Sequence, residues 1–354
     1  MIVYVPHYPE HAGHYIYRGY EAAWKELGYD VRLVEATRTD NDGDGSIIRT
    51  NFDNINPPPG EYIVQGIASL LGTPKSYELI ENSHKSFVHV QPNAYPNPWG
   101  AHPNFMCGSS IETMRRLNSL KNVHLWTFGD ETRLHFKWKK VHTIPLAFDH
   151  VNYQREEHDK FKKFDVCFIG GWANNGFNEK RKIMLDIFKE FKSSGLNCGI
   201  FIEKNLTHDQ EQKILHNSKI TLNIHDNYQR ILGHDTNERT FKSLGLNGLL
   251  VSDTVGQLTR MFPDIQTTNE PKKMVEICKE LLSLEDKELE DIREGRRQDV
   301  LDNHCYIHRV KSMLELPEAE CRPGGVDNLP PEWKNFLSDA QKKEIERQMQ
   351  ELLA

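Results

Sequence analysis

Short apolar runs alternate with amphipathic stretches along the chain, and this alternation predicts two successive α/β units. In the first half, residues 2–6 predict a strand, residues 15–27 carry apolar side chains at helical spacing, and residues 30–35 predict a second strand. A strand, a helix and a strand in that order form a parallel βαβ unit with a right-handed crossover. The polar turn at 7–14 then lies at the carboxyl edge of the sheet, where α/β proteins bind ligands.

The rest of the first half continues this pattern around one long polar insertion. Residues 38–60 are rich in Asp, Asn, Gly and Pro, which predicts a loop or insertion and not a strand. Its DNDGDGS segment superficially resembles a calcium loop. It lacks the preceding helix and the glutamate at the twelfth loop position, so calcium binding is not expected. Further strands are expected at 61–65, 86–90 and 123–128, with a helix over about 108–120.

The second half repeats strand, glycine turn, helix and strand more regularly. The run FDVCFIGG predicts a strand that ends in Gly170 and Gly171, and an amphipathic helix follows it. Farther along, TNERTFKSLGLNG predicts a helix that ends at Gly248. A long charged helix is expected over 270–301, and a last helix over 333–353. This order of elements favours a second Rossmann-like domain.

Length and composition agree with an N-terminal domain at 1–148, a C-terminal domain at 149–315, and a crossing segment with a final helix at 316–354. The 354 residues, 38% hydrophobic and 27% charged, suffice for two cores. No run approaches 18 apolar residues, so no membrane span is expected. The net charge of -7 does not favour nucleic acid as a partner. Six scattered cysteines and the lack of a signal-like N-terminus predict a cytoplasmic protein with reduced thiols.

The glycine turn is the first candidate for a binding site. Gly170 and Gly171 would let backbone amides approach a phosphate, and the following helix would offer its N-terminal dipole. Arg181, near the start of that helix, could pair with a diphosphate. The alternative is an ordinary turn with a surface arginine. The motif is neither a dinucleotide fingerprint nor a P-loop.

The second candidate is the start of a helix farther along the chain. Asn237, Arg239 and Thr240 stand there, and polar groups at a helix start on the carboxyl edge of a sheet suit a nucleotide diphosphate. The alternative is an N-cap followed by a solvated arginine.

Four segments, taken in order, resemble the motifs of CgeB-like glycosyltransferases (glycosyltransferase group 1) with a GT-B fold. The segments are IPLAFDHVNY at 144–153, DVCFIGG with Arg181, NERTFKSLGLNGLLVSD at 237–253, and HCYIHRVKSML at 304–314. The resemblance in sequence motifs extends over about residues 124–314. The N-terminal domain resembles the family only in its predicted order of strands and helices. The resemblance implies two Rossmann-like domains that face each other across a cleft, with the C-terminal helix crossing back to the first domain.

The resemblance also implies how the domains divide the work. The second domain would bind a UDP- or GDP-sugar, and the first would supply most acceptor contacts. Carried onto this chain, Gly170, Gly171 and Arg181 fall at the diphosphate turn, and the Asn237–Thr240 helix start falls near the phosphates and sugar.

One position departs from the family pattern. The family's glutamate after the phenylalanine is here Lys242, and the residue eight positions before it is His234. A lysine cannot accept the hydrogen bonds of ribose hydroxyls, so another group does so or the donor is held differently. Because of this departure, the sequence does not decide whether the reaction retains or inverts the configuration at the sugar's anomeric carbon.

The remaining candidates lie in turns and at strand ends. His14, with Gly13 beside it for close backbone approach, is a candidate general base or charge stabiliser near the sugar. Asp130 is a second candidate base, and His225 could contact the donor, although a strand-end histidine is often a structural hydrogen bonder. The loop at 90–105 offers Tyr95 and Trp99 for stacking, or is simply a Pro-rich structural loop. The spacing of His7, His11 and His14 is not a metal signature, so no metal site is expected.

These features predict a metal-independent glycosyltransferase with a nucleotide-sugar donor as co-substrate and no other cofactor. The acceptor would be a glycan, or hydroxymethylated DNA if the enzyme is phage-like. Basic residues in two clusters keep the DNA alternative open: Arg115, Arg116, Lys137, Lys139 and Lys140. The other functional class that fits is a non-catalytic two-domain ligand-binding protein, which the Lys242 departure mildly favours.

Overall fold

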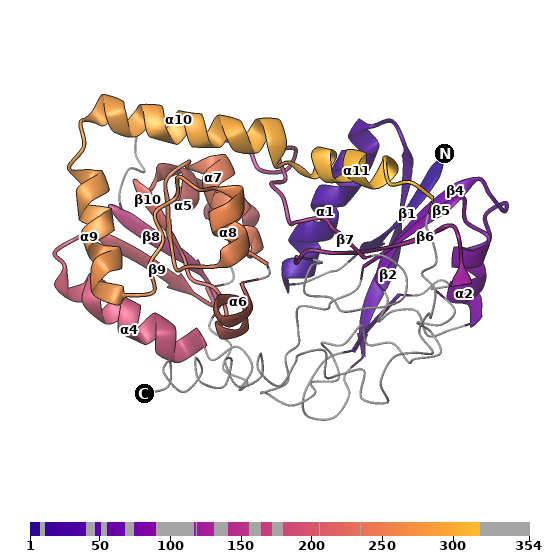
Figure 1. Cartoon of the computed structure of the whole chain (residues 1–354), viewed down its shortest axis with the longest axis horizontal. Helices are drawn as coiled ribbons and strands as arrows, with labels where there is room; N and C mark the ends of the chain where they lie inside the picture. The colour runs from indigo at the N-terminus through magenta and orange to yellow at the C-terminus, as the bar shows by residue number, and fades with distance from the viewer. Residues whose placement is uncertain are drawn as a thin grey trace. The chain divides into compact units, whose positions relative to one another are not determined.

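A computed structural model divides the chain into two compact units (Figure 1). The first unit comprises residues 1–145 and 306–354, and the second comprises residues 146–305. The structure describes residues 1–7, 11–39, 47–50, 55–67, 74–89, 117, 119–130, 141–155, 164–171, 180–204, 206–233 and 235–318. The final helix expected at 333–353 lies outside these described residues.

The first unit is built on a seven-stranded sheet whose order is β3-β2-β1-β4-β5-β6-β7. Neighbouring strands are parallel, except that β2 and β3 are antiparallel. The elements are β1 (Ile2–His7), α1 (His11–Glu26), β2 (Asp30–Thr39), β3 (Ile47–Thr50), β4 (Tyr62–Ile67), α2 (Pro74–Glu81), β5 (Lys85–His89), β6 (Val123–Thr127), β7 (Val141–Thr143) and α11 (Tyr306–Leu314). The parallel βαβ unit predicted at the start of the chain is confirmed, because α1 connects β1 to the parallel strand β2.

Two predictions for this unit were wrong in detail. The segment 38–60 is not all loop, because β3 pairs antiparallel with β2 through Ile47 to Thr50. The local excess of Asp and Gly hid a short edge strand whose apolar content is only two isoleucines. The helix α1 begins at His11 and not at residue 15, so the turn after β1 is shorter than predicted.

Helix α11 belongs to the first unit, although the prediction placed residues up to 315 in the second domain. The Tyr306 ring packs on α1 where Gly19 has no side chain, and its centroid lies 4.7 Å from that of Tyr20. Arg309 Nε donates to the carbonyl oxygen of Pro145 at 3.0 Å. The absence of a Cβ at position 19 therefore makes room for the returning helix.

The second unit contains a four-stranded parallel sheet in the order β11-β10-β8-β9. Its elements are β8 (Val166–Gly170), α4 (Lys180–Ser193), β9 (Cys198–Ile202), α5 (His208–Asn217), β10 (Ile220–Asn223), α6 (Asn227–Leu232), α7 (Glu238–Leu246), β11 (Leu250–Ser252), α8 (Gly256–Met261), α9 (Pro271–Leu282) and α10 (Asp286–Asn303). This order of elements is the predicted second Rossmann-like domain.

The long charged helix predicted over 270–301 is in fact two helices, α9 and α10. The Ser283 hydroxyl donates to the carbonyl oxygen of Glu280 at 2.7 Å, and the Ser283 amide also bonds back to the last turn. A serine that competes for backbone carbonyls in this way favours a helix end, and charge pattern alone did not reveal it.

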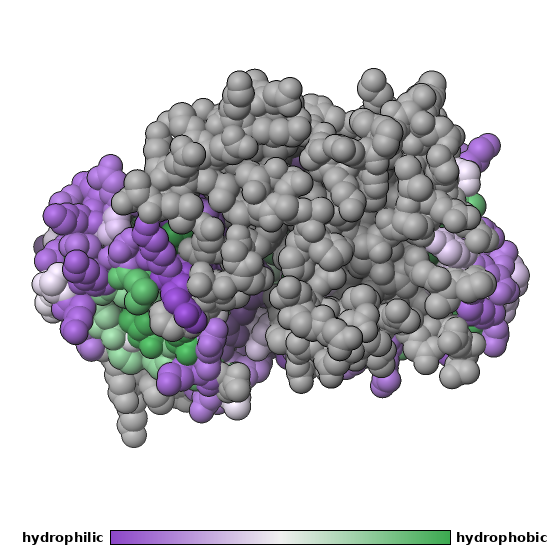
Figure 2. All heavy atoms as spheres, turned by 90° about the horizontal axis from the view of Figure 1, so that it is seen from below, coloured by the Kyte–Doolittle hydropathy of each residue, from purple (hydrophilic) through white to green (hydrophobic). Residues whose placement is uncertain are grey.

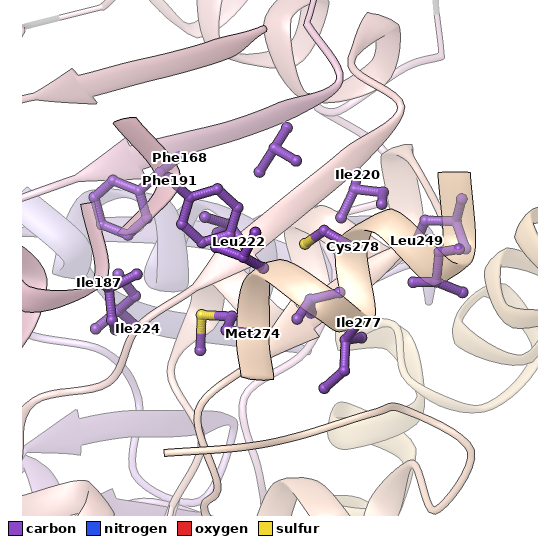
Figure 3. Packing of buried hydrophobic residues seen from close by; sticks show 14 of the residues in the cluster. Phe168, Ile187, Phe191, Ile220, Leu222, Ile224, Leu249, Met274, Ile277 and Cys278 are labelled. Atoms are coloured by element: carbon purple, nitrogen blue, oxygen red, sulfur yellow. The ribbon is translucent and has the colours of Figure 1, made fainter. Parts of the chain in front are cut away.

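The core of the second unit fixes the strands on which the site is built. Phe168 of β8 and Leu222 of β10 pack with Phe191 of α4 and with Met274 and Cys278 of α9 (Figure 3). At the left of Figure 2, hydrophobic side chains gather in one patch of the surface, with hydrophilic side chains around it. The packed core holds β8, β10 and β11 parallel, so their carboxyl ends form one edge.

Replacing Gly248 by alanine is expected to destabilise the second unit by about 3 kcal/mol. Gly248 ends α7 with φ at +83°, and a Cβ there would overlap the backbone carbonyl of Arg293. Gly195 is the matched control, because its φ is +81° but no atom lies within 4 Å of its virtual Cβ. Gly195→Ala is expected to cost only the backbone strain, about 1 kcal/mol. Denaturant unfolding of both variants measures the difference, and equal costs would show that the Arg293 contact is unimportant.

Candidate functional site

The carboxyl edge of the sheet in the second unit gathers the candidate residues. Strand β8 ends at Gly170, β10 ends at Asn223, and β11 is followed by Asp253. Helix α7 begins beside them, where Asn237 caps it and the Asn237 Oδ1 accepts from the Thr240 amide at 3.3 Å. The predicted helix start is therefore confirmed. Parallel strand ends and a helix N-terminus on one edge are the usual setting of a ligand site in α/β domains.

Arg239 turns back from α7 onto the strand ends. Its Nε donates to the carbonyl oxygen of Ile169 at 2.6 Å, and its Nη1 donates to Asn223 Oδ1 at 3.1 Å and to the carbonyl oxygen of Ile224 at 3.3 Å. The guanidinium lies over the Phe168 ring, with 4.9 Å between Cζ and the ring centroid. Arg239 is therefore a fixed cation at the sheet edge and not a freely solvated side chain.

The structure brings Gly170 and Arg239 together. A Cβ on Gly170 would overlap Nη2 of Arg239, so the glycine makes room for the guanidinium. Gly171 is exposed and has no atom within 4 Å of its virtual Cβ. Among the described residues, Nη2 has no hydrogen-bond partner, which leaves one N–H pair of the guanidinium for a ligand beside the glycine turn.

A buried chain of hydrogen bonds anchors Arg239 from behind. Asn223, which accepts from Arg239, donates to Thr240 Oγ1 at 2.8 Å, and the Thr240 and Thr236 hydroxyls lie 2.5 Å apart. Thr236 Oγ1 is 2.8 Å from His225 Nε2, and His225 Nδ1 is 2.6 Å from Asp253 Oδ1. Each group can donate to the next, from Asn223 to the carboxylate of Asp253. The chain of bonds fixes the tip of α7 against the strand ends.

His225 and Thr240 are thus placed differently from the direct donor contacts that the sequence suggested. Both side chains are fully buried, and both His225 ring nitrogens lie within hydrogen-bond distance of protein side chains. In this position they orient Arg239 and the start of α7. Burial alone would raise the pKa of Asp253, but His225 and Arg230 outweigh it and hold this pKa below its usual value.

Lys180 is a cation of this edge that the sequence motifs did not single out. It is 6% exposed, and its Nζ lies 3.2 Å from Asp226 Oδ1. Burial lowers the pKa of Lys180, with nearby Arg239 acting in the same direction and Asp226 opposing it. Arg181, the residue predicted to bind a diphosphate, is exposed on α4.

The helical period contained the signal that separates these two neighbours. Residues Met184, Ile187 and Phe191 form the buried face of α4, and Lys180 lies one turn before Met184 on that same face. Counting back from the apolar positions would therefore have favoured Lys180 over Arg181.

Lys242, the departure from the family pattern, lies in a buried cluster of charges between α5 and α7. Its Nζ is 2.7 Å from Glu211 Oε1 and 3.2 Å from Glu238 Oε1. The Tyr153 hydroxyl donates to the other oxygen of Glu211 at 2.9 Å. Burial lowers the pKa of Lys242, but Glu238 and Glu211 outweigh it and hold this pKa above its usual value. Lys242 is therefore ion-paired with both of these carboxylates.

The candidates of the first unit lie at the carboxyl edge of its own sheet. Gly13 and His14 are in the first turn of α1, and the His14 ring centroid is 6.3 Å from that of His7 at the end of β1. Asp130 follows β6 and is half-buried. The further candidates Tyr95, Trp99 and His234 and the two basic clusters lie outside the described residues.

The described residues were also searched for metal clusters and for membrane-spanning helices. Across the ranges that the structure describes, no group of three or more His, Cys, Asp or Glu side chains could hold a metal ion. None of the helices in those ranges combines the length and the hydropathy needed to cross a bilayer.

Comparison with known proteins identifies the second unit. Residues 166–315 match the family model described as glycosyl transferase-like. This part of the chain is thus similar to the glycosyl transferase-like family. The match includes the glycine turn, Arg239 and the buried chain of hydrogen bonds that anchors it. No curated protein matches the chain.

Solved structures support the fold. An alpha-glucosyltransferase in complex with UDP and a 13-mer DNA containing a HMU base aligns with 89% of this chain and 98% of its own, at 11% identity and a TM-score of 0.57. An alpha-glucosyltransferase in complex with UDP-glucose and DNA containing an abasic site aligns over 89% and 99%, at 13% identity and a TM-score of 0.54. A mutant of TarM from S. aureus aligns over 74% of this chain, at 11% identity and a TM-score of 0.53.

The chain therefore has the predicted α/β GT-B fold class. The family match agrees with the predicted glycosyltransferase class and does not single out the CgeB-like group. The chain spans 56% of the length of TarM.

Proposed function

We propose that this chain transfers a sugar from a nucleotide-sugar donor and that the donor diphosphate binds at the carboxyl edge of the second unit. The observation that carries the proposal is the Arg239 guanidinium, which is fixed by three protein acceptors while its Nη2, beside the glycine turn, bonds to none of the described residues. A guanidinium held in this way presents a preorganised charge to a phosphate. The backbone of Gly171 and the N-terminus of α7 add N–H donors on the same edge.

The same groups account for departure of the nucleoside diphosphate without a metal ion. Negative charge develops on the leaving diphosphate as its bond to the sugar breaks. Arg239 and Lys180 are two cations at this edge, and Lys180 needs only to loosen from Asp226 to contribute. Fixed cations and backbone dipoles stabilise such charge without reorganisation. We infer a metal-independent transferase on this basis.

The donor and acceptor follow from the fold neighbours as proposals. UDP is present with both alpha-glucosyltransferases, as UDP or as UDP-glucose, and with TarM, which favours a UDP-sugar over a GDP-sugar for this chain. The acceptor supplies a hydroxyl. The match along nearly the whole alpha-glucosyltransferase chain favours hydroxymethylated DNA as the acceptor. The net charge of -7 favours a glycan instead, because a negatively charged protein is repelled by DNA.

Calorimetric titration of the full chain with UDP, GDP and their sugar conjugates tests the proposal. UDP-sugar binding is expected, followed by slow hydrolysis in water and faster turnover with an acceptor, with no loss of rate in chelator. Steep salt dependence of acceptor binding would identify DNA as the acceptor, and shallow dependence a glycan. A chain that binds no nucleoside diphosphate would refute the proposal, and binding without turnover would establish the non-catalytic alternative.

A further inference from the structure

The outward face of α4 in the second unit carries an exposed leucine. Leu185 is 52% exposed, more than any other large hydrophobic side chain in the helices and strands that the structure describes. The face that packs on the core is formed by Lys180, Met184, Ile187 and Phe191, and by helical spacing Leu185 points away from it. A leucine in this position exposes apolar surface to water and adds little to the core.

Basic side chains share this outward face with Leu185. Four exposed cations surround the leucine at helical spacing: Arg181, Lys182, Lys189 and Lys192. The two acidic residues of the helix, Asp186 and Glu190, lie together on one flank, outside this group. Leu185 and the four cations form a continuous surface, which we call the basic stripe of α4.

The lysines of the basic stripe differ from those on other surface helices. On α5, Lys213 lies 2.8 Å from Asp209, the acid one turn before it. One turn before Lys189 stands Leu185 instead of an acid. In the part of the chain that the structure describes, Lys189 and Lys192 take part in no ion pair. The charge of these two lysines is therefore available to an external anion.

The basic stripe also differs in sign from the rest of the molecule. The whole chain carries a net charge of -7, so the part outside the stripe is more acidic still. An anionic surface would repel that acidic part and attract the stripe. Attraction through one face would fix the orientation of the second unit on such a surface.

The exposed leucine indicates which kind of anionic partner fits. Contacts to the phosphates of DNA need cations and no apolar centre. Helices that lie in a membrane interface combine both, because their apolar side chains enter the acyl boundary while lysine and arginine reach the lipid phosphates. Figure 1 places α4 on the lower side of the second unit, and Figure 2 views that side, where hydrophobic side chains gather among hydrophilic ones. The pattern favours an anionic phospholipid bilayer over nucleic acid.

We propose that the basic stripe of α4 docks the second unit on an anionic lipid surface, with Leu185 inserted at the level of the headgroups. The cations supply a salt-dependent attraction, and the leucine adds an apolar contribution. The proposal does not depend on the proposed sugar transfer. Docking of this kind would favour a lipid-linked glycan among the acceptors.

Co-sedimentation of the full chain with lipid vesicles, without any donor, tests the proposal. Vesicles of phosphatidylcholine mixed with phosphatidylglycerol are expected to bind the chain, and vesicles of phosphatidylcholine alone to bind it weakly, with binding lost at high salt. Lys189→Glu combined with Lys192→Glu is expected to weaken binding at least about 30-fold, and Leu185→Gln about fivefold. The melting temperature of both variants is expected to be unchanged, because these side chains are exposed.

Lys25→Glu combined with Lys287→Glu is the matched control. It changes the net charge by the same amount on two other helices, at lysines that are 56% and 87% exposed. Its vesicle binding is expected to stay within about twofold of the wild-type level. An equal loss in this control would mean that net charge and not the stripe determines binding, which overturns the proposal. Absent binding to the mixed vesicles, or equal binding to both kinds of vesicle, overturns it as well.

Two other occupants of the stripe would give different results, and either would overturn lipid docking. Duplex DNA that binds in place of vesicles, with Leu185→Gln unaffected, would make the stripe a nucleic-acid surface. A concentration-dependent dimer in place of vesicle binding, dissolved by Leu185→Gln in analytical ultracentrifugation, would make it a contact between copies of the chain. Vesicle binding by a chain that transfers no sugar would retain the docking face while the transferase function fails.

Discussion

Replacing Arg239 by alanine is expected to lower kcat/KM for sugar transfer by about 100- to 1000-fold. The loss has two sources. The variant removes the N–H groups that Nη2 offers to the leaving diphosphate, and it leaves the acceptors on Ile169, Asn223 and Ile224 without their donor. Arg239→Lys is expected to recover little, because one ammonium cannot replace a planar fork that bonds three protein acceptors and a ligand at once. Steady-state kinetics with a UDP-sugar measure both variants.

Adjacent glycines provide a way to displace Arg239 without removing its charge. A Cβ on Gly170 overlaps Nη2 of Arg239, whereas one on Gly171 meets no atom within 4 Å. Gly170→Ala is therefore expected to lower transfer at least about tenfold, because misplacing a positioned group by even about 1 Å is costly. Gly171→Ala adds a Cβ without displacing Arg239, and it is expected to lower transfer less than Gly170→Ala does. Normal activity in Gly170→Ala or in Arg239→Ala would mean that the diphosphate does not bind here.

The sequence predicts that Gly170 and Arg239 lie near each other, but it does not predict that the glycine makes room for the guanidinium. Strand, glycine and helix patterns predicted that both segments lie on one carboxyl edge, because that follows from parallel strands with right-handed crossovers. From the strand, glycine and helix pattern alone, a glycine at position 170 is expected to let a phosphate approach the backbone. In the structure it is room for a guanidinium that comes from a helix much farther along the chain. Which side chain fills the space above a glycine depends on tertiary packing, which periodicity does not contain.

The same limit applies to the residues behind the edge. Asn223, Thr236 and Asp253 come from three segments, and only the folded sheet joins them into one chain of hydrogen bonds to His225. His225 was a candidate ligand contact because strand-end polar residues often point to a site. Whether such a side chain points outward or is satisfied from within is decided by a partner such as Asp253, 28 positions away. Lys180 differs, because the apolar period of α4 already placed it on the buried face.

Lys242 shows why a family pattern cannot be carried over one residue at a time. The glutamate of the resembling family would stand here beside Glu211 and Glu238, and three carboxylates would then share one buried place. The lysine is therefore tied to those two acidic residues. Position 242 therefore does not supply the carboxylate that the resembling family provides there.

Lys242→Met is accordingly expected to destabilise the second unit by about 3–5 kcal/mol, because it leaves buried carboxylates without their cation. The side chains of Lys242 and Glu211 are only 8% and 11% exposed, so solvent screens the loss weakly. Lys242→Glu is expected to cost still more through repulsion between like charges. Denaturant unfolding of the full chain, with hydrogen exchange at the β10 amides to attribute the change to this unit, measures both.

The double variant Lys242→Met with Glu211→Gln separates the charge from the packing. It removes the cation together with the charge of its nearer carboxylate, and the neutral amide introduced in place of Glu211 can still accept from the Tyr153 hydroxyl. Most of the stability lost in Lys242→Met is expected to return, since replacing both members of a buried pair costs far less than removing one. A double variant as unstable as Lys242→Met would show that the lysine stem, and not its charge, holds α5 and α7 together.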